Sequence, residues 1–201
     1  MIELPASGKL VIASGNPGKL SEIGRLLMPF GLEIVAQSEL GVSPAEEPHP
    51  TFVENALAKA RHVSAATGLP ALADDSGICV PALGGEPGVH SARYAGTAAT
   101  DELNNVRLLQ AMSSVTDRRA HYYCVIVLLR QHNDPQPIIA EGKWHGDILR
   151  APRGAGGFGY DPVFLDPGSG LTGAELAPSR KNRVSHRGKA MRKLLRAIKS
   201  S

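Results

Sequence analysis

Two adjacent carboxylates, Asp74 and Asp75, follow an apolar run and precede the turn-prone pair Ser76 and Gly77. We expect a strand over residues 69–75 that delivers both acids to a loop. A hard cation such as Mg²⁺ prefers oxygen ligands and keeps several waters, so one or two carboxylates are enough to hold it. The second acid could orient a lysine or act as a general base for water. Two acids that only cap a turn at a strand end are the alternative interpretation.

A glycine-rich turn that ends in a lysine lies near the start of the chain. It departs from the P-loop pattern, because Ala13 and Leu20 stand where that pattern has a glycine and a hydroxyl residue. Glycines let backbone N–H groups face a phosphate, a helix N-terminus adds partial positive charge, and the lysine adds a full charge. Phosphate binding and an ordinary strand-to-helix connection are both open on this motif alone. The turn consists of Ser14, Gly15, Asn16, Pro17, Gly18 and Lys19.

A second glycine-rich stretch, residues 154–159, leads into a short aromatic and acidic segment. An aromatic ring exposed by such a loop could stack on a nucleoside base, and a neighbouring carboxylate could accept an N–H from the base edge. The alternative is that both aromatic residues fill the core. The candidate residues of this segment are Phe158, Gly159, Tyr160 and Asp161.

The segment over residues 180–199 carries nine Lys or Arg residues and no acid. We expect Ser185 to cap a helix whose first turn contains His186 and Arg187, where hydrogen-bond donors can face a ligand. A solvated basic helix start and a helix that binds RNA are the alternatives. The segment has no aromatic residue nearby, which disfavours RNA binding by base stacking.

The composition is that of a globular protein with a modest positive charge. The 201 residues include 22 Lys and Arg against 19 Asp and Glu, and this net charge of +3 does not by itself indicate nucleic-acid binding. Cys79 and Cys124 lie in apolar runs and are expected to be buried thiols. The first residues lack a secretory signal pattern, and no apolar run approaches the roughly 20 residues of a membrane-spanning helix. We therefore expect a cytoplasmic protein with no membrane and no nucleic-acid partner.

The elements that must position these residues follow in the order strand, glycine turn, helix and strand, which opens an α/β fold. Thr51 and Glu54 predict the capping box of a helix that Gly68 ends. We expect strands over residues 9–13, 32–36, 69–75, 78–83, 120–131 and 137–149, and helices over 20–28, 51–67, 102–112 and 185–199.

Six motifs follow one another along the chain. They are Ser14-Gly-Asn-Pro-Gly-Lys19, Thr51-Phe-Val-Glu-Asn-Ala56, Ala73-Asp-Asp-Ser-Gly77, Pro87-Gly88 with Ser91-Ala-Arg-Tyr-Ala-Gly96, Gly157-Phe-Gly-Tyr-Asp-Pro162 and Ser185-His-Arg-Gly188. In this order and spacing they resemble the inosine/xanthosine triphosphate pyrophosphatase family, from about Lys9 to Ile198. His90 departs from the pattern, because we would expect tyrosine there, and this affects the shape of its loop more than the chemistry.

The resemblance implies a fold and an activity. The fold would be a two-lobed α/β one, with a long central mixed sheet flanked by helices and an active-site cleft between the lobes. We expect residues 1–201 to form a single nucleotide pyrophosphatase domain, usually as a homodimer. The implied reaction is the Mg²⁺-dependent hydrolysis of deaminated purine nucleoside triphosphates (ITP, dITP and XTP) to the monophosphate and pyrophosphate, which removes them from the nucleotide pool.

The resemblance also implies a role for each candidate residue. Asp75 would be the general base, and Glu46 and Asp75 would lie at the metal. The turn from Ser14 to Lys19 would hold the triphosphate, Lys59 would add charge near it, and Ser76 would line the substrate site. The base pocket would consist of Phe158, Gly159, Tyr160, Asp161, Lys181, His186 and Arg187.

Two other functions remain open on the sequence. A related pyrophosphatase could act on modified pyrimidine or on standard nucleotides, and a substrate panel separates that enzyme from the first. A nucleotide- or RNA-binding module without turnover would instead bind through the basic C-terminal helix, would not need Mg²⁺, and would release no pyrophosphate.

Overall fold

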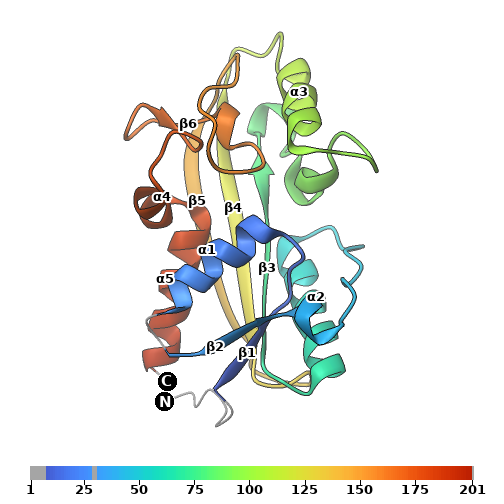
Figure 1. Ribbon diagram of the computed structural model, residues 1–201. Helices are drawn as coiled ribbons and strands as arrows, with labels where there is room; N and C mark the ends of the chain where they lie inside the picture. The colour runs from blue at the N-terminus through green and yellow to red at the C-terminus, as the bar shows by residue number, and fades with distance from the viewer. Residues whose placement is uncertain (1–7, 29–30, 201) are drawn as a thin grey trace. The chain divides into compact units, whose positions relative to one another are not determined.

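A mixed seven-stranded sheet forms the framework of the protein, whose computed structural model describes residues 8–28 and 31–200 (Figure 1). The strand order is β2-β1-β3-β4-β5-β6-β7. Strand β1 is parallel to both β2 and β3, whereas β6 is antiparallel to both β5 and β7. The strands are β1 Lys9–Ile12, β2 Glu33–Ala36, β3 Ala71–Cys79, β4 Arg119–Leu129, β5 Ile138–Ile148, β6 Phe164–Asp166 and β7 Leu171–Thr172.

Helices flank this sheet, and local signals set most of their ends. Asn16, Thr51 and Thr100 cap α1, α2 and α3, because each side chain accepts the backbone N–H three residues later. Gly68 ends α2 in the left-handed conformation, with φ of 68°, as the sequence predicts. The helices are α1 Pro17–Leu27, α2 Phe52–Thr67, α3 Asp101–Ala111, α4 Pro178–Val184 and α5 His186–Ser200. Short 3₁₀ turns cover Gln37–Leu40, Pro81–Leu83, Gly88–Arg93 and Asp161–Val163.

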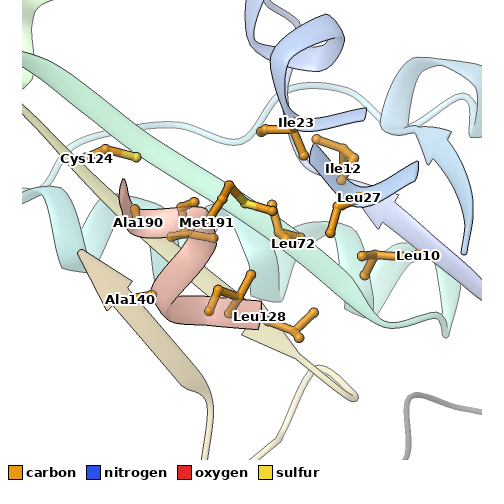
Figure 2. Packing of buried hydrophobic residues seen from close by; sticks show 12 residues of the cluster. Leu10, Ile12, Ile23, Leu27, Leu72, Cys124, Leu128, Ala140, Ala190 and Met191 are labelled. Atoms are coloured by element: carbon orange, nitrogen blue, oxygen red, sulfur yellow. The ribbon is translucent and has the colours of Figure 1, made fainter. Parts of the chain in front are cut away.

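The described chain divides into two compact units, and β3, β4 and β5 each contribute residues to both. The first unit contains the described residues up to Asp75, residues 124–142, and the chain from Arg187 onward. Its core joins β1, α1, β3, β4, β5 and α5 (Figure 2). The residues labelled there are Leu10, Ile12, Ile23, Leu27, Leu72, Cys124, Leu128, Ala140, Ala190 and Met191. Burial of these apolar side chains fixes the helix and strand that carry the glycine turn and the two acids.

The second unit contains residues 76–123 and 143–186 and has a core of its own. Aromatic rings dominate this core: the Trp144 ring lies 4.8 Å from Phe164 and 6.0 Å from Tyr122, centroid to centroid. The indole Nε1 of Trp144 donates a hydrogen bond to Asp166 Oδ1 at 3.0 Å, which satisfies its polar group inside the core. This core supports the segment from Phe158 to Asp161.

Several expected elements differ from the structure. No separate strand covers residues 78–83, because Ile78 and Cys79 belong to β3 and Pro81–Leu83 form a 3₁₀ turn. Strand β3 runs without interruption from Ala71 to Cys79, so Asp74 and Asp75 lie inside a strand and not in a loop at its end. Ser76 and Gly77 are typical of turns, but buried neighbours on both sides keep the backbone extended here. The last predicted helix is also preceded by a separate one, α4, with Pro178 at its start, where proline is tolerated. Within the described residues, no helix is long and apolar enough to cross a membrane.

Candidate active site

The glycine turn exposes the N-terminus of α1. Asn16 is the N-cap, and its Oδ1 accepts the backbone N–H of Lys19 at 3.1 Å. The Ser14 hydroxyl in turn accepts the N–H of Asn16 at 3.2 Å, which fixes the path into the helix. Gly15, Asn16 and Pro17 are exposed, so solvent and ligands can reach this positive helix end.

Asp74 anchors two cations from distant parts of the first unit. Its side chain is 0% exposed, and its Oδ2 lies 3.3 Å from Lys19 Nζ. The same oxygen accepts hydrogen bonds from Arg187 Nε at 3.2 Å and Nη2 at 3.1 Å. Hydrogen bonds and ion pairs between a carboxylate and cations are among the stronger polar contacts in proteins. Asp74 is therefore suited to hold Lys19 in place.

Arg187 is buried between two carboxylates. Its Nη1 donates to Glu22 Oε2 at 2.5 Å, while Nε and Nη2 face Asp74. Burial alone would lower the pKa of Arg187, but the attraction of Asp74 and Glu22 outweighs it and raises the pKa. Base reading by Arg187 stays a prediction; these contacts, all within the first unit, favour a role in holding Asp74.

Lys59 links Asp75 to the acidic loop before α2. Its Nζ lies 2.9 Å from Asp75 Oδ1 and 2.7 Å from Glu47 Oε1. The resemblance implies Glu46 as the loop acid at the metal. The structure brings its neighbour Glu47 to the lysine and leaves Glu46 exposed. The side chains of Lys59 and Asp75 are only 11% and 7% exposed, so the pair is largely desolvated.

The pKa values of both Asp75 and Lys59 are raised. Burial raises the pKa of Asp75; attraction to Lys59 and Lys19 opposes this and the negative charge of Glu47 adds to it. Burial would lower the pKa of Lys59, but attraction to Asp75, Asp74 and Glu47 outweighs it, so this pKa is raised too. The two shifts therefore have different causes: burial dominates at Asp75, and the attraction of neighbouring carboxylates dominates at Lys59.

The second oxygen of Asp75 could bind a cation or a water. Asp75 Oδ2 is buried and has no hydrogen-bond partner among the described residues. Buried carboxylate oxygens are rarely left in this state without a water, an ion or a catalytic role. The residues fit Mg²⁺ bound through one or two carboxylates and substrate phosphates, because that ion keeps most of its waters. In the described part of the chain, no group of three or more His, Cys, Asp or Glu residues could hold a metal without such help.

In the second unit, Asp161 organises the aromatic segment. Its Oδ2 accepts the backbone N–H of Phe158 at 2.9 Å and lies 2.5 Å from Lys181 Nζ. The ammonium of Lys181 also lies 4.7 Å from the centroid of the partly buried Phe158 ring, within the range of a cation–π contact. The structure therefore brings Phe158, Asp161 and Lys181 together, as the resemblance implies.

Helix α3 also contacts the segment from Phe158 to Asp161, through two hydrogen bonds to Gly159. The backbone N–H of Gly159 donates to Asp101 Oδ2 at 2.6 Å, and its carbonyl accepts from Asn105 Nδ2 at 2.9 Å. Asp101 and Asn105 are four residues apart, so they lie on one face of α3. Helix α3 thus provides hydrogen-bond partners for both the N–H and the carbonyl of Gly159. These two hydrogen bonds fix the backbone direction at Gly159.

The remaining candidates lie at the core or at a unit boundary. Tyr160 is buried and its hydroxyl donates to the Ser91 carbonyl at 2.8 Å, so it packs as a core residue. The His186 ring stacks on Tyr122, with centroids 4.6 Å apart and planes inclined by 7°. Ser76 is half-buried in β3 directly after Asp75.

Sequence reasoning missed Glu22, Asp101 and Asn105. Glu22 had one available signal: it is a charged residue next to Ile23 on the apolar face of a helix, three positions after Lys19. Asp101 and Asn105 had none, because a helix cap and a polar surface residue explain them equally well from the sequence. Their partner, Gly159, lies more than 50 positions further along the chain.

A mixed sheet flanked by helices thus carries a lysine turn beside two buried acids, an arrangement suited to a phosphorylated ligand. The family model of the Ham1 family matches residues 10–197, and the chain belongs to this family. It is 64% identical over 190 residues to the dITP/XTP pyrophosphatase of Nitrosomonas europaea, covering 94% of each chain. It is 58% identical over 194 residues to the dITP/XTP pyrophosphatase of Ralstonia nicotianae, covering 95% of this chain and 96% of that one.

Solved structures agree. A HAM1 protein from Coxiella burnetii superposes with a TM-score of 0.89 at 47% identity, covering 96% of this chain and 99% of that one. These comparisons confirm the family, the mixed α/β fold and the enzyme class expected from the sequence, a nucleoside triphosphate pyrophosphatase.

Proposed function

We propose that this protein hydrolyses deaminated purine nucleoside triphosphates (dITP, XTP and ITP) to the nucleoside monophosphate and pyrophosphate. The names of its relatives support the substrate class, and the charged residues of the first unit support the chemistry. The biological consequence would be removal of these nucleotides from the pool.

The observation that carries the proposal is the state of the Asp75 carboxylate. One oxygen is fixed by Lys59 at 2.9 Å, while the other is buried with no partner among the described residues. A carboxylate with a raised pKa is a stronger base than an exposed aspartate. The contact with Lys59 also fixes the orientation of this carboxylate. Such a group can accept a proton from a water that is placed against Oδ2.

The proposed reaction gives each of these residues a role. Water attacks the α-phosphorus, and its proton passes to Asp75 as the new oxygen–phosphorus bond forms. The bond from this phosphorus to the bridging oxygen breaks, and pyrophosphate leaves with the electron pair. Lys19 and the N-terminus of α1 would hold the phosphates and offset the charge that develops on the leaving group. Lys59 would keep Asp75 in place and add positive charge beside it.

The proposed reaction uses a magnesium ion bound at the carboxylates near Lys59. Asp75 would hold the ion, with Glu46 as the second ligand expected from the resemblance, and Glu47 is the loop acid that Lys59 brings toward Asp75. The ion, when bound, would neutralise phosphate charge during the transfer. Because so few carboxylates gather here, we expect its tight binding to depend on the substrate phosphates.

We assign recognition of the base to residues of the second unit, and base reading by Arg187 of the first unit stays a further prediction. Phe158 offers a partly exposed ring for stacking, and Lys181 offers a donor beside it. Inosine and xanthosine carry a carbonyl at C6 where adenosine carries an amino group. A site that presents donors there leaves an adenine amino group unpaired, which is costly in a desolvated pocket. The proposal also keeps a homodimer and a cytoplasmic location as predictions.

Identification of the products tests this reaction directly. The enzyme is incubated with dITP and Mg²⁺ in ¹⁸O-labelled water, and the products are separated and weighed by mass spectrometry. We expect dIMP and pyrophosphate, with the label in dIMP. Label in the pyrophosphate would contradict attack at the α-phosphorus, and formation of dIDP with inorganic phosphate would contradict the pyrophosphatase assignment.

A further inference from the structure

A buried glutamate in α1 has no role in the reaction described so far. The side chain of Glu22 is 8% exposed, and its Oε2 lies 2.5 Å from Arg187 Nη1. Its neighbours Ile23 and Leu27 belong to the core of the first unit. Burying a carboxylate among apolar side chains is costly unless a cation pairs with it. Arg187 is this cation, and it also contacts Asp74.

We propose that Glu22 is a positioning residue that holds Lys19 in place for phosphate binding, acting through Arg187 and Asp74. The inference rests on the proposed function of the glycine turn. The contacts form an unbroken chain: Glu22 to Arg187 at 2.5 Å, Arg187 to Asp74 at 3.1 Å, and Asp74 to Lys19 at 3.3 Å.

The charges explain why Glu22 matters to a residue that it does not touch. Asp74 Oδ2 faces two cations, Arg187 and Lys19, and one carboxylate cannot neutralise both. Glu22 supplies the second negative charge, so the four residues are together neutral. The side chain of Arg187 is 2% exposed and cannot be solvated, whereas Lys19 is 17% exposed. Without Glu22, Arg187 keeps Asp74 and Lys19 turns to solvent.

The geometry of α1 makes this arrangement rigid. Lys19 and Glu22 are three residues apart, so both side chains leave the same face of the helix. The helix therefore carries both ends of the chain of contacts, and Ile23 and Leu27 fix it to the core. The ammonium group that would meet the triphosphate thus has its position set by buried residues.

A double-mutant cycle with inorganic pyrophosphate as the probe tests the proposal. Its binding is measured by calorimetry for the wild type, Glu22→Gln, Lys19→Met and the double variant. We expect Glu22→Gln to weaken binding about tenfold when Lys19 is present, and about twofold or less in the Lys19→Met background, as coupled neighbours behave. If Glu22→Gln does not fold, Glu22→Asp gives the same comparison, because it keeps the charge but shortens the reach to Arg187.

Three outcomes would overturn the proposal. In the first, Glu22→Gln lowers the melting temperature but leaves the affinity for pyrophosphate unchanged. In the second, Glu22→Gln weakens pyrophosphate binding equally with Lys19 present and in the Lys19→Met background. In the third, Glu22→Gln binds pyrophosphate more tightly than the wild type. Glu33→Gln is the matched control, because Glu33 pairs with Lys9 on the surface, and we expect no change there. Turnover of dITP by the wild type is measured separately. A failure of turnover would refute the proposed function, while the cycle would still report whether Glu22 acts through Lys19.

Discussion

Asp75 and Lys59 form a buried ion pair in which Nζ lies 2.9 Å from Oδ1, and the same ammonium also contacts Glu47. The two neighbouring aspartates, Asp74 and Asp75, differ in the cations that they contact. Asp74 faces Arg187 and Lys19, whereas Asp75 faces Lys59. Adjacent residues of one strand point to opposite faces, so each meets its own set of partners.

Replacement of the proposed base is the first prediction. Asp75→Asn keeps the size of the side chain but removes the proton acceptor, so we expect kcat on dITP to fall by about 10²-fold or more. Asp117→Asn is the control, because Asp117 pairs with Arg119 on the surface. A near-normal kcat in Asp75→Asn, measured by pyrophosphate release, would remove Asp75 from this role.

Titration of Asp75 is the second prediction. In the metal-free protein, carbon NMR of the side-chain carboxyl should show a pKa above that of an ordinary aspartate, because burial raises it. Lys59→Met should raise this pKa further, since Lys59 favours the charged form. The raised pKa also means that Asp75 stabilises the folded protein most at low pH, and that this contribution is lost as pH rises through the folded pKa. A pKa at or below the ordinary value would contradict the account of the cluster.

The third prediction concerns the hydrogen bond from Asn105 of α3 to the carbonyl of Gly159. Asn105→Ala removes the donor to the Gly159 carbonyl, a hydrogen bond worth about 0.5–1.5 kcal/mol, so kcat/KM for dITP should fall up to about tenfold. Affinity for pyrophosphate should not change, because the phosphate residues lie in the first unit. Gln110→Ala, an exposed position on the same helix, is the control. Equal losses for dITP and pyrophosphate would argue against a role in base recognition.

Gly157 provides the fourth prediction, a test of the local structure. Its φ is +75°, and a side chain there would collide with the carboxylate of Asp161. We expect Gly157→Ala to lower the free energy of unfolding by about 1–3 kcal/mol. Gly24→Ala, in the middle of α1 with no atom near its added methyl group, should instead be neutral or stabilising by up to about 1 kcal/mol. Urea unfolding of both variants checks the contrast, and equal stabilities would contradict it.

The sequence predicted those parts of the fold that depend on neighbouring residues. The helix from Thr51 to Gly68 is an example, since its cap and its terminating glycine act within one turn of each end. Ser76 and Gly77 misled the prediction, because their preference for turns is weaker than the pairing and burial of β3.

The candidate site was predictable as a set of residues but not as a set of contacts. The lysine turn and the acid pair stand out in the sequence because glycines before a lysine suit phosphate binding and adjacent carboxylates suit a metal ion. The partners of Arg187 are not, since Glu22 and Asp74 lie 165 and 113 positions away. Only the packing of α1 against the core decides that this arginine meets carboxylates.

A substrate panel tests the central claim most directly. Pyrophosphate release is measured from dITP, XTP, ITP, ATP, GTP and dTTP, each with Mg²⁺ and with a chelator. The account predicts rapid, metal-dependent release from the first three and little from the others. Comparable release from the standard nucleotides would contradict the proposed selectivity, and no release from any of them, with salt-sensitive binding of RNA, would replace the enzyme with a binding module.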